Sequence, residues 1–531
     1  MAEKSKVIFT TLLIEKSPQA LPLGAACVAS AVKHSPLTKD IADVSLVHFC
    51  KEDSEFIKHS ATDDDAASFM ASELLKHNPA IVGFSIFVWN RIVLEKTAAV
   101  LKSHGIKCIC GGPEVTADPS SFTGFEKAIG GEGEYSIPHI VYEILTGKKT
   151  APSSEEKSYE NLESPYLDGT LDPSEFEGAL WELARGCPFK CSYCYESKGE
   201  KKVRMFPMER IEKELELFAK KKVPQVFVLD PTYNANKNRA IELINKIAKK
   251  TPNTFYYFEA RAEFIDRQLA HAFTKIPCSL QIGLQSADPN VLNLVNRPFN
   301  KAAFLKGINC LNQEGAVFGL DVIYGLPGDS LAGFKNSVDF AISQYPNNLE
   351  LFCLSVLPGT DLHDRAESLK LVWESHPPYH IIHTDKFTNE DIKKAEGIAK
   401  ACNVFYNDGR AVPWFNSILH ALHMKASEFF VLFYKHMVSH NIPSDCREHR
   451  EIEKLQIQFI TDIFTQRKME RMIPLAQDII SFNGAVSRKI DTGKSETVQL
   501  HYPAEYIDSE YAMDLQFFVK NVQKRPSKFT T

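Results

Sequence analysis

The chain has 531 residues, of which 44% are hydrophobic, and it carries a formal net charge of −6 with a pI near 6.3. This length predicts about three domains, and the charge leaves no basic surplus for holding a nucleic-acid backbone. No apolar run approaches the roughly 20 residues that a membrane helix requires, and the first residues lack the plan of a signal peptide. We therefore expect a globular, cytoplasmic protein that binds neither nucleic acid nor membrane.

Short apolar runs alternate with helical stretches through residues 1–150. The candidate strands are Val7 to Ile14, Val44 to Phe49, Ile81 to Ile86, Ile106 to Gly111 and Ala128 to Gly130. The stretches between them space their apolar residues as helices do, at Leu23 to Lys33, Ala66 to Lys76, Arg91 to Ser103 and Tyr135 to Leu145. This alternation predicts an α/β domain with a doubly wound, Rossmann-like parallel sheet.

Three of these strands end in small or Gly-rich loops. Ser85 closes the third strand, Gly112-Pro113-Glu114 follows the fourth, and Gly131-Glu132-Gly133-Glu134 follows the fifth. Doubly wound sheets bind ligands beyond the carboxyl ends of their strands, but glycines also serve simply to make tight turns. The loops by themselves leave both interpretations open.

A polar, turn-rich stretch over residues 151–178 is typical of a linker. Beyond it, residues 179–374 again alternate strands with helices. The candidate strands are Leu180 to Ala184, Gln225 to Leu229, Phe255 to Ala260, Leu280 to Leu284, Phe318 to Tyr324 and Leu349 to Ser355. Six such β/α units fit a partial TIM-type (β/α)6 barrel better than a closed barrel of eight.

Three cysteines, Cys187, Cys191 and Cys194, lie within eight residues just after the first of these strands. A structural zinc site needs a fourth protein ligand, whereas a four-iron cluster held by three thiolates keeps one iron open. A zinc knuckle and a chance group of buried thiols are the alternatives. No further His or Cys follows closely enough to complete a knuckle, so the spacing favours iron.

The C-x-x-x-C-x-x-C spacing, with the aromatic Tyr193 before the last cysteine, resembles the cluster motif of the radical S-adenosylmethionine (SAM) superfamily. The resemblance implies a [4Fe-4S] cluster held by the three cysteines. It also implies SAM bound at the open iron, a 5′-deoxyadenosyl radical formed by reductive cleavage, and a reducing partner such as flavodoxin or ferredoxin.

The order of the Gly-Gly-Pro-Glu and Gly-Glu-Gly-Glu loops ahead of such a core resembles the cobalamin-binding domain of cobalamin-dependent radical SAM enzymes. It implies cobalamin contacts at Ser85, Gly112, Pro113, Glu114, Gly131, Glu132, Gly133 and Glu134. No Asp-x-His-x-x-Gly occurs in the first 150 residues, so a histidine below the cobalt is not expected.

Polar or flexible residues follow the later barrel strands, where active residues of such barrels gather. By the same resemblance, Asp230 and Asn234 would hold the SAM amino group, Arg261 its carboxylate and Glu259 a ribose hydroxyl. A structural salt bridge is the alternative for the last two. Further SAM contacts are expected at Gln285, Ser286, Ile323 and Gly325.

Residues 375–531 are mostly helical in pattern, with strand-like pieces near Ile479 to Asn483 and Thr497 to His501. This region resembles the extension of an uncharacterised branch of cobalamin-dependent radical SAM proteins, which implies a domain that shapes the substrate pocket. Nothing in it identifies the substrate.

Together the two cofactors imply methylation of an unactivated carbon, or of phosphorus, in a small molecule. One alternative is a cobalamin-dependent cyclisation, oxidation or rearrangement without methyl transfer. An alternative from another class is a non-catalytic carrier of cobalamin or of an iron-sulfur cluster.

Overall fold

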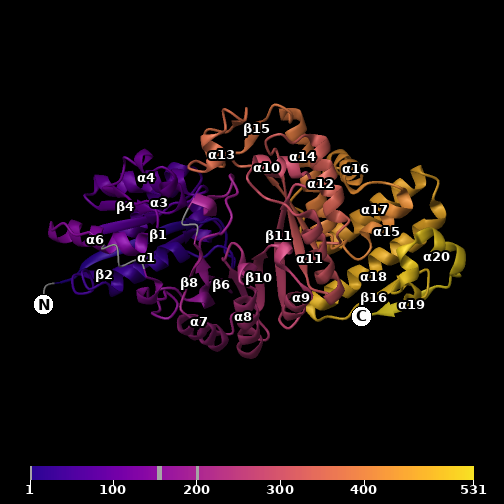
Figure 1. The fold of residues 1–531 in the computed structure, drawn as a ribbon, viewed down its shortest axis with the longest axis horizontal. Helices are drawn as coiled ribbons and strands as arrows, with labels where there is room; N and C mark the ends of the chain where they lie inside the picture. Colours follow the sequence, from indigo (N-terminus) through magenta and orange to yellow (C-terminus); the bar gives the residue numbers. More distant parts are fainter. Residues whose placement is uncertain (1–2, 152–157, 199–201) are drawn as a thin grey trace. The chain divides into compact units, whose positions relative to one another are not determined.

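The computed structural model describes residues 3–151, 158–198 and 202–531. The chain forms two compact units (Figure 1). The first comprises Met1–Ser279, Ser355–Ala366 and Glu374–His380, and the second comprises Leu280–Leu354, Glu367–Trp373 and Ile381–Thr531. These units divide the chain within the predicted barrel region, so the predicted boundaries at 150, 178 and 374 stay predictions. Part of the expected linker, residues 152–157, lies outside the described residues.

The first unit begins with the predicted parallel sheet. Its strands are β1 (Ser5–Leu13), β2 (Ala42–Cys50), β3 (Ile81–Ser85), β4 (Lys107–Gly111) and β5 (Lys127–Ala128), in the order β2-β1-β3-β4-β5. All paired strands run parallel. The order reverses between β1 and β3, which makes this the topological switch point, where such sheets bind ligands.

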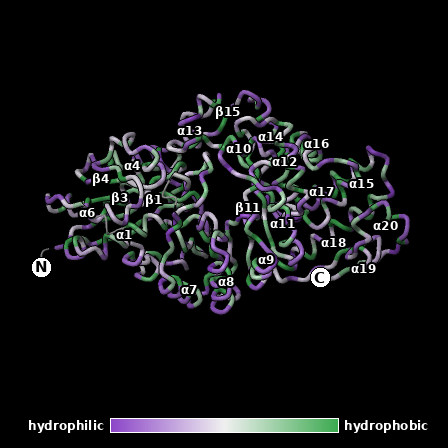
Figure 2. Tube along the Cα trace, in the orientation of Figure 1, coloured by the Kyte–Doolittle hydropathy of each residue, from purple (hydrophilic) through white to green (hydrophobic). Residues whose placement is uncertain are grey.

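Helices cover both faces of this sheet because its strands are apolar on both sides. Val7 and Phe9 pack with helices α1 (Leu23–His34) and α6 (Gly133–Thr146), whereas Ile8 packs with α3 (Asp63–Leu75) and α4 (Arg91–Ser103). Figure 2 shows the hydrophobic residues of these strands in green. The doubly wound fold is confirmed.

The barrel strands of the first unit are β6 (Ala179–Trp181), β9 (Gln225–Val228) and β10 (Phe255–Ala260), which pair in parallel. Helices α7 (Met208–Lys221) and α8 (Lys237–Lys250) connect them. The predicted first strand is shorter than expected, since Asp230 accepts hydrogen bonds from the backbone N–H groups of Leu183 and Ala184. The chain leaves the sheet there and forms β7 (Ala184–Arg185), which pairs antiparallel with β8 (Arg204–Met205).

The second unit contains most of β11 (Cys278–Gln285), together with β12 (Phe318–Tyr324) and β13 (Asn348–Cys353). These strands are parallel neighbours, and α11 (Lys301–Glu314) and α12 (Leu331–Ile342) connect them. Six strands therefore alternate with helices along the chain, as the sequence predicts.

The remainder of the second unit is mainly helical, with α14 (Asn389–Cys402), α16 (Ala426–Ser439), α17 (His449–Gln466) and α18 (Ile473–Thr492). The strand-like piece near Ile479 is part of α18, because its apolar residues fall on one buried helical face. The later piece forms β16 (Thr497–Leu500), which pairs with β17 (Ser527–Thr530).

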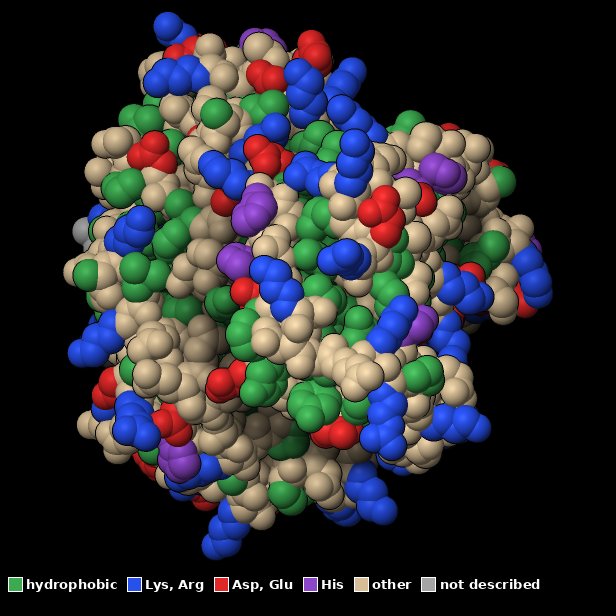
Figure 3. Space-filling model, turned by 90° about the vertical axis from the view of Figure 1, so that its right-hand side faces the viewer, with side chains coloured by type: hydrophobic (Ala, Val, Ile, Leu, Met, Phe, Trp, Pro, Cys, Tyr) green, Lys and Arg blue, Asp and Glu red, His purple; other side chains and the backbone are tan. Residues whose placement is uncertain are grey.

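Among the described helices, none combines the length and the apolar character needed to cross a membrane. On the face drawn in Figure 3, Lys and Arg side chains are spread singly or in small groups, with acidic and apolar side chains between them.

Candidate functional site

The three clustered cysteines lie in the loop that joins β7 to β8. Arg185 and Arg204 pair across the base of this hairpin, and we call its described residues, 184–198 and 202–205, the cysteine hairpin. Cys191 is buried, Cys187 and Cys194 are half-buried, and the Cys194 N–H donates to the Cys191 carbonyl at 3.0 Å. Burial raises the pKa of Cys194 to about 11.

The described residues contain no group of three or more His, Cys, Asp or Glu side chains arranged to hold a metal ion. A zinc ion requires its ligands at about 2.0–2.3 Å from one centre. A four-iron cluster differs because each thiolate binds a separate iron, so its cysteines need not converge on one point. The cluster assignment of the three cysteines stays a prediction.

Two of the expected SAM residues in the first unit, Asp230 and Asn234, form hydrogen bonds with backbone groups. Asp230 is bound by the N–H groups of Leu183 and Ala184 at 2.8 and 3.0 Å. Asn234 donates to the Arg261 carbonyl at 2.8 Å and accepts from the Arg261 N–H at 3.0 Å. These contacts show both side chains shaping the ends of barrel strands, and their direct contact with SAM stays a prediction.

Arg261 itself links the end of β10 to the cysteine hairpin. Its side chain is buried, and its guanidinium lies 4.1 Å from the centre of the Phe189 ring, which belongs to the loop between Cys187 and Cys191. It also forms an ion pair with Glu263 at 3.3 Å. Glu259, two residues earlier in the strand, is exposed. A buried cation beside the cluster motif is suited to a carboxylate ligand.

The other expected SAM residues belong to the second unit. Gln285 has a left-handed backbone (φ 68°), and the buried Ser286 lies with its hydroxyl 3.4 Å from that of Ser337. Ile323 is half-buried near the end of β12. Gly325 has φ 86°, and a Cβ added there would lie 2.5 Å from the Ile381 side chain. Only glycine fits this turn, which is a structural reason for the Gly-Leu-Pro-Gly sequence.

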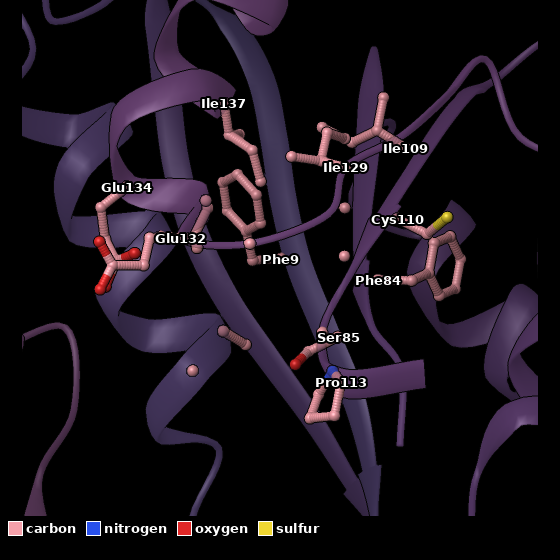
Figure 4. A pocket seen from close by; sticks show the side chains of 18 of the residues that line it. Phe9, Phe84, Ser85, Ile109, Cys110, Pro113, Ile129, Glu132, Glu134 and Ile137 are labelled. Carbon is pink, nitrogen blue, oxygen red and sulfur yellow. The ribbon is translucent and has the colours of Figure 1, made fainter. Parts of the chain in front are cut away.

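A cavity of about 300 Å³ opens at the carboxyl edge of the N-terminal sheet (Figure 4). Its walls come from β1, β3, β4, the loops that follow β4 and β5, and helices α1 and α6. Seven of the predicted cobalamin residues line it: Ser85, Gly112, Pro113, Gly131, Glu132, Gly133 and Glu134. The structure thus brings together three loops that the sequence placed up to 50 residues apart.

The interior of the cavity is apolar and closely bounded by backbone. Figure 4 shows Phe9 beside Ile129 and Ile137. A Cβ added at Gly83 would lie 2.6 Å from the Phe9 ring, and one added at Gly112 (φ 108°) would lie 2.5 Å from the Ile86 carbonyl oxygen. Both positions therefore require glycine, because a side chain there would collide with Phe9 or with the Ile86 backbone.

Glu114 differs from the other predicted cobalamin residues because it does not line the cavity. Its buried carboxylate accepts hydrogen bonds from Arg91 at 3.2 Å and from the Tyr379 hydroxyl at 3.0 Å. Pro113 begins helix α5 (Pro113–Ala117), and successive helical residues point about 100° apart. Pro113 consequently faces the cavity while Glu114 faces the segment around Tyr379.

Two arginines that the sequence analysis missed bind the acidic loop of the cavity. Arg185 forms ion pairs with Glu134 at 2.7 Å, Glu182 at 2.8 Å and Glu132 at 3.5 Å, and Arg204 pairs with Glu132 at 2.7 Å. Burial opposes ionisation of Glu132, but the arginines and a hydrogen bond from Tyr159 outweigh it and lower its pKa. The signal in the sequence was charge complementarity between the hairpin and Gly-Glu-Gly-Glu.

Comparison with known families separates two parts of the chain. Residues 181–341 match the radical SAM superfamily, and residues 367–492 match a protein family of unknown function, DUF4080. The 2-(S-pantetheinyl)-carbapenam-3-carboxylate methyltransferase of Streptantibioticus cattleyicolor is 27% identical over an alignment of 332 positions, which covers 54% of this chain. The chain spans 48% of the length of that relative.

Two solved structures share the fold. The cobalamin-dependent SAM radical enzyme OxsB, with aqua-cobalamin bound, superposes with a TM-score of 0.57 at 14% identity, covering 98% of this chain and 84% of OxsB. The radical SAM methyltransferase TsrM from Kitasatospora setae, with cobalamin and a [4Fe-4S] cluster bound, gives 0.54 at 13% identity, covering 71% of this chain and 78% of TsrM. At these identities the likeness establishes the fold.

Proposed function

The chain carries a radical SAM domain at residues 181–341, and from this premise we propose that it is a cobalamin-dependent radical SAM enzyme. The proposed reaction is methylation of an unactivated carbon, or of phosphorus, in a small molecule. One observation carries the proposal. The cavity at the switch point of the sheet shares Arg185 with the hairpin that holds the three cysteines, so two sites for cofactors lie side by side within one unit.

The donor sets fit these groups. Three cysteines in one loop suit a [4Fe-4S] cluster with an open iron. A cavity of about 300 Å³ with apolar walls is too small for a whole cobalamin and suits the flat nucleotide base at one end of it. When bound, the cluster supplies the electron that cleaves SAM, and cobalamin supplies the methyl group.

The residues of the chain bind and orient these groups. Cys187, Cys191 and Cys194 would hold the cluster, and Tyr193 belongs to the same loop. Arg261 presents a buried cation next to that loop, which suits the SAM carboxylate. Gly325 makes the tight turn that follows β12, and the half-buried Ile323 offers an apolar contact for an adenine ring.

The proposed setting is the cytoplasm, with flavodoxin or ferredoxin as the electron donor. Twelve cysteines in a chain of 531 residues are too sparse for a disulfide scaffold, which supports a reducing compartment. The name of the Streptantibioticus relative supports methyl transfer. The second candidate function is a cobalamin-dependent cyclisation, oxidation or rearrangement without methyl transfer, which the same two cofactors could support.

The test is anaerobic purification with iron and hydroxocobalamin supplied, followed by reduction in the presence of SAM. We expect about four irons and one cobalt per chain, together with 5′-deoxyadenosine. A triple variant with Ala at Cys187, Cys191 and Cys194 should lose the iron and the deoxyadenosine but keep the cobalt. Deoxyadenosine formation by the triple variant would refute the assignment, and cobalt and iron without deoxyadenosine would indicate a carrier.

A substrate screen then separates the two reactions. A product heavier than its substrate by one methylene unit indicates methyl transfer. A product of equal mass, or one lighter by two hydrogens, indicates rearrangement or oxidation.

A further inference from the structure

The cysteine hairpin contacts the walls of the cavity on both sides of its three cysteines in sequence. Arg185 lies two residues before Cys187, and Tyr195 follows Cys194 directly. Arg185 pairs with the Glu132–Glu134 loop, whereas the Tyr195 hydroxyl donates to the Pro113 carbonyl at 2.9 Å. The two partners belong to different loops, and both loops line the cavity. Residues that contact the cavity walls thus lie both before and after the three cysteines in the sequence.

Arg185 belongs to a network of charged and aromatic side chains that has little exposure to solvent. The side chains of Arg185 and Glu134 are 17% and 8% exposed. Tyr159 and Phe206 stack at 4.5 Å between ring centres, and the Arg204 guanidinium lies 4.6 Å from the centre of the Tyr159 ring. Separating a buried pair leaves an uncompensated charge in a poorly solvated place. The acidic loop and the base of the hairpin are therefore expected to move together.

The Tyr195 end is uncharged, and besides Pro113 the Tyr195 hydroxyl forms a hydrogen bond with the Thr116 side chain. Pro113 begins helix α5 and lines the cavity. A ligand that moves Pro113 would therefore also move Tyr195, the residue next to Cys194.

Resting on the proposed function, we infer that the Arg185 and Tyr195 contacts couple the two cofactor sites. Binding of cobalamin with its nucleotide base in the cavity favours the position of the hairpin that accepts the cluster, and the cluster in turn favours cobalamin binding. Arg185 and Tyr195 act as positioning residues, since each acts through a cavity loop or a neighbouring cysteine.

The coupling has a quantitative signature because it is reciprocal. If the cluster changes the affinity for cobalamin by some factor, cobalamin must change the affinity for the cluster by the same factor. Typical coupling factors are about 5–150, and we expect about tenfold here because two separate contacts are involved.

The experiment compares hydroxocobalamin affinity in two forms of the full chain, reconstituted with iron and sulfide or stripped by a chelator. Absorbance titration gives the dissociation constant of each form. The wild type is expected to bind about tenfold more tightly with the cluster than without it. The double variant Glu134→Gln/Tyr195→Phe removes one charge from the Arg185 network and the Tyr195 hydroxyl, and its two forms should bind equally.

The ratio of the two constants isolates the coupling. Glu134 lines the cavity, so Glu134→Gln can change the affinity of both forms, but such a change cancels in the ratio. The matched control is Tyr142→Phe/Glu143→Gln, which changes two residues of helix α6 that do not line the cavity; it should keep the wild-type ratio. If the double variant fails to hold iron, Glu132→Gln alone tests the Arg185 end.

Two outcomes overturn the inference. A ratio of one in the wild type shows that the sites are independent, and a wild-type ratio in the double variant shows that other contacts carry the coupling. Failure of the proposed function is distinguishable, because the wild type would then show no saturable binding of hydroxocobalamin in either form.

Discussion

The burial of Asp230 leads to a pH-dependent stability that a single substitution should abolish. This side chain follows β9, is 8% exposed, and accepts the Leu183 and Ala184 N–H groups at 2.8 and 3.0 Å. Burial raises its pKa to about 7, although the two hydrogen bonds partly oppose the shift. We therefore expect that ionising Asp230 costs free energy in the folded state, and that this cost is absent in the unfolded chain.

The sign and size follow from proton linkage. An unfolded aspartate has a pKa of about 3.9, so between about pH 4 and pH 7 the folded protein binds a proton that the unfolded chain does not. The free energy of unfolding therefore falls as the pH rises through this window. A difference of about three pKa units corresponds to about 4 kcal/mol once the pH exceeds 7.

Asp230→Asn keeps an oxygen that accepts both N–H groups but has no charge to bury. We expect the variant to exceed the wild type in unfolding free energy by about 2–4 kcal/mol at pH 8 and by only about 1 kcal/mol at pH 5. Urea unfolding measured at both pH values tests this, and amide exchange at Leu183 and Ala184 reports the site directly. The variant should also cleave SAM less well if Asp230 contacts the SAM amino group.

A control substitution should show the opposite sign. Asp172 forms an ion pair with Lys221 at 2.6 Å, and this hydrogen bond lowers its pKa. Asp172→Asn should therefore be slightly less stable than the wild type above about pH 4 and equal to it below its lowered pKa. A stability difference for Asp230→Asn that is the same at pH 5 and pH 8 would refute the reasoning.

Three further substitutions or measurements follow from packing and burial. Gly83→Val forces a branched side chain against the Phe9 ring; we expect a loss of stability of about 1–3 kcal/mol and weaker hydroxocobalamin binding, with unchanged iron content on analysis. Phe405→Ala leaves a hole among the aromatic rings of the helical region and should cost about 3–5 kcal/mol, seen as an earlier step in urea unfolding. Burial raises the pKa of Cys108 to about 12, so iodoacetamide at pH 8 should label the half-buried Cys310 and leave Cys108 unmodified by mass spectrometry.

Much of the fold could be read from local pattern. The alternation of apolar runs with helical stretches predicts the five-stranded sheet and the six barrel strands, and the structure confirms both sets. Local pattern succeeds here because a parallel strand buried on both faces must be apolar throughout. The strand predicted near Ile479 was wrong, because a run of apolar residues fits a buried helix as well as a strand.

The same distinction between local pattern and long-range contacts applies to the functional residues. The cysteine motif and the Gly-rich loops could be recognised from local sequence, because they depend on residue types at short spacing. The three-dimensional arrangement was needed to show that Glu114 faces Tyr379 instead of the cavity, and that Arg185 and Arg204 bind the acidic loop about 50 to 70 residues earlier. Where a side chain points, and which distant residue it meets, depends on helix geometry and on how the loops of separate strands come together. Local spacing does not encode either of these.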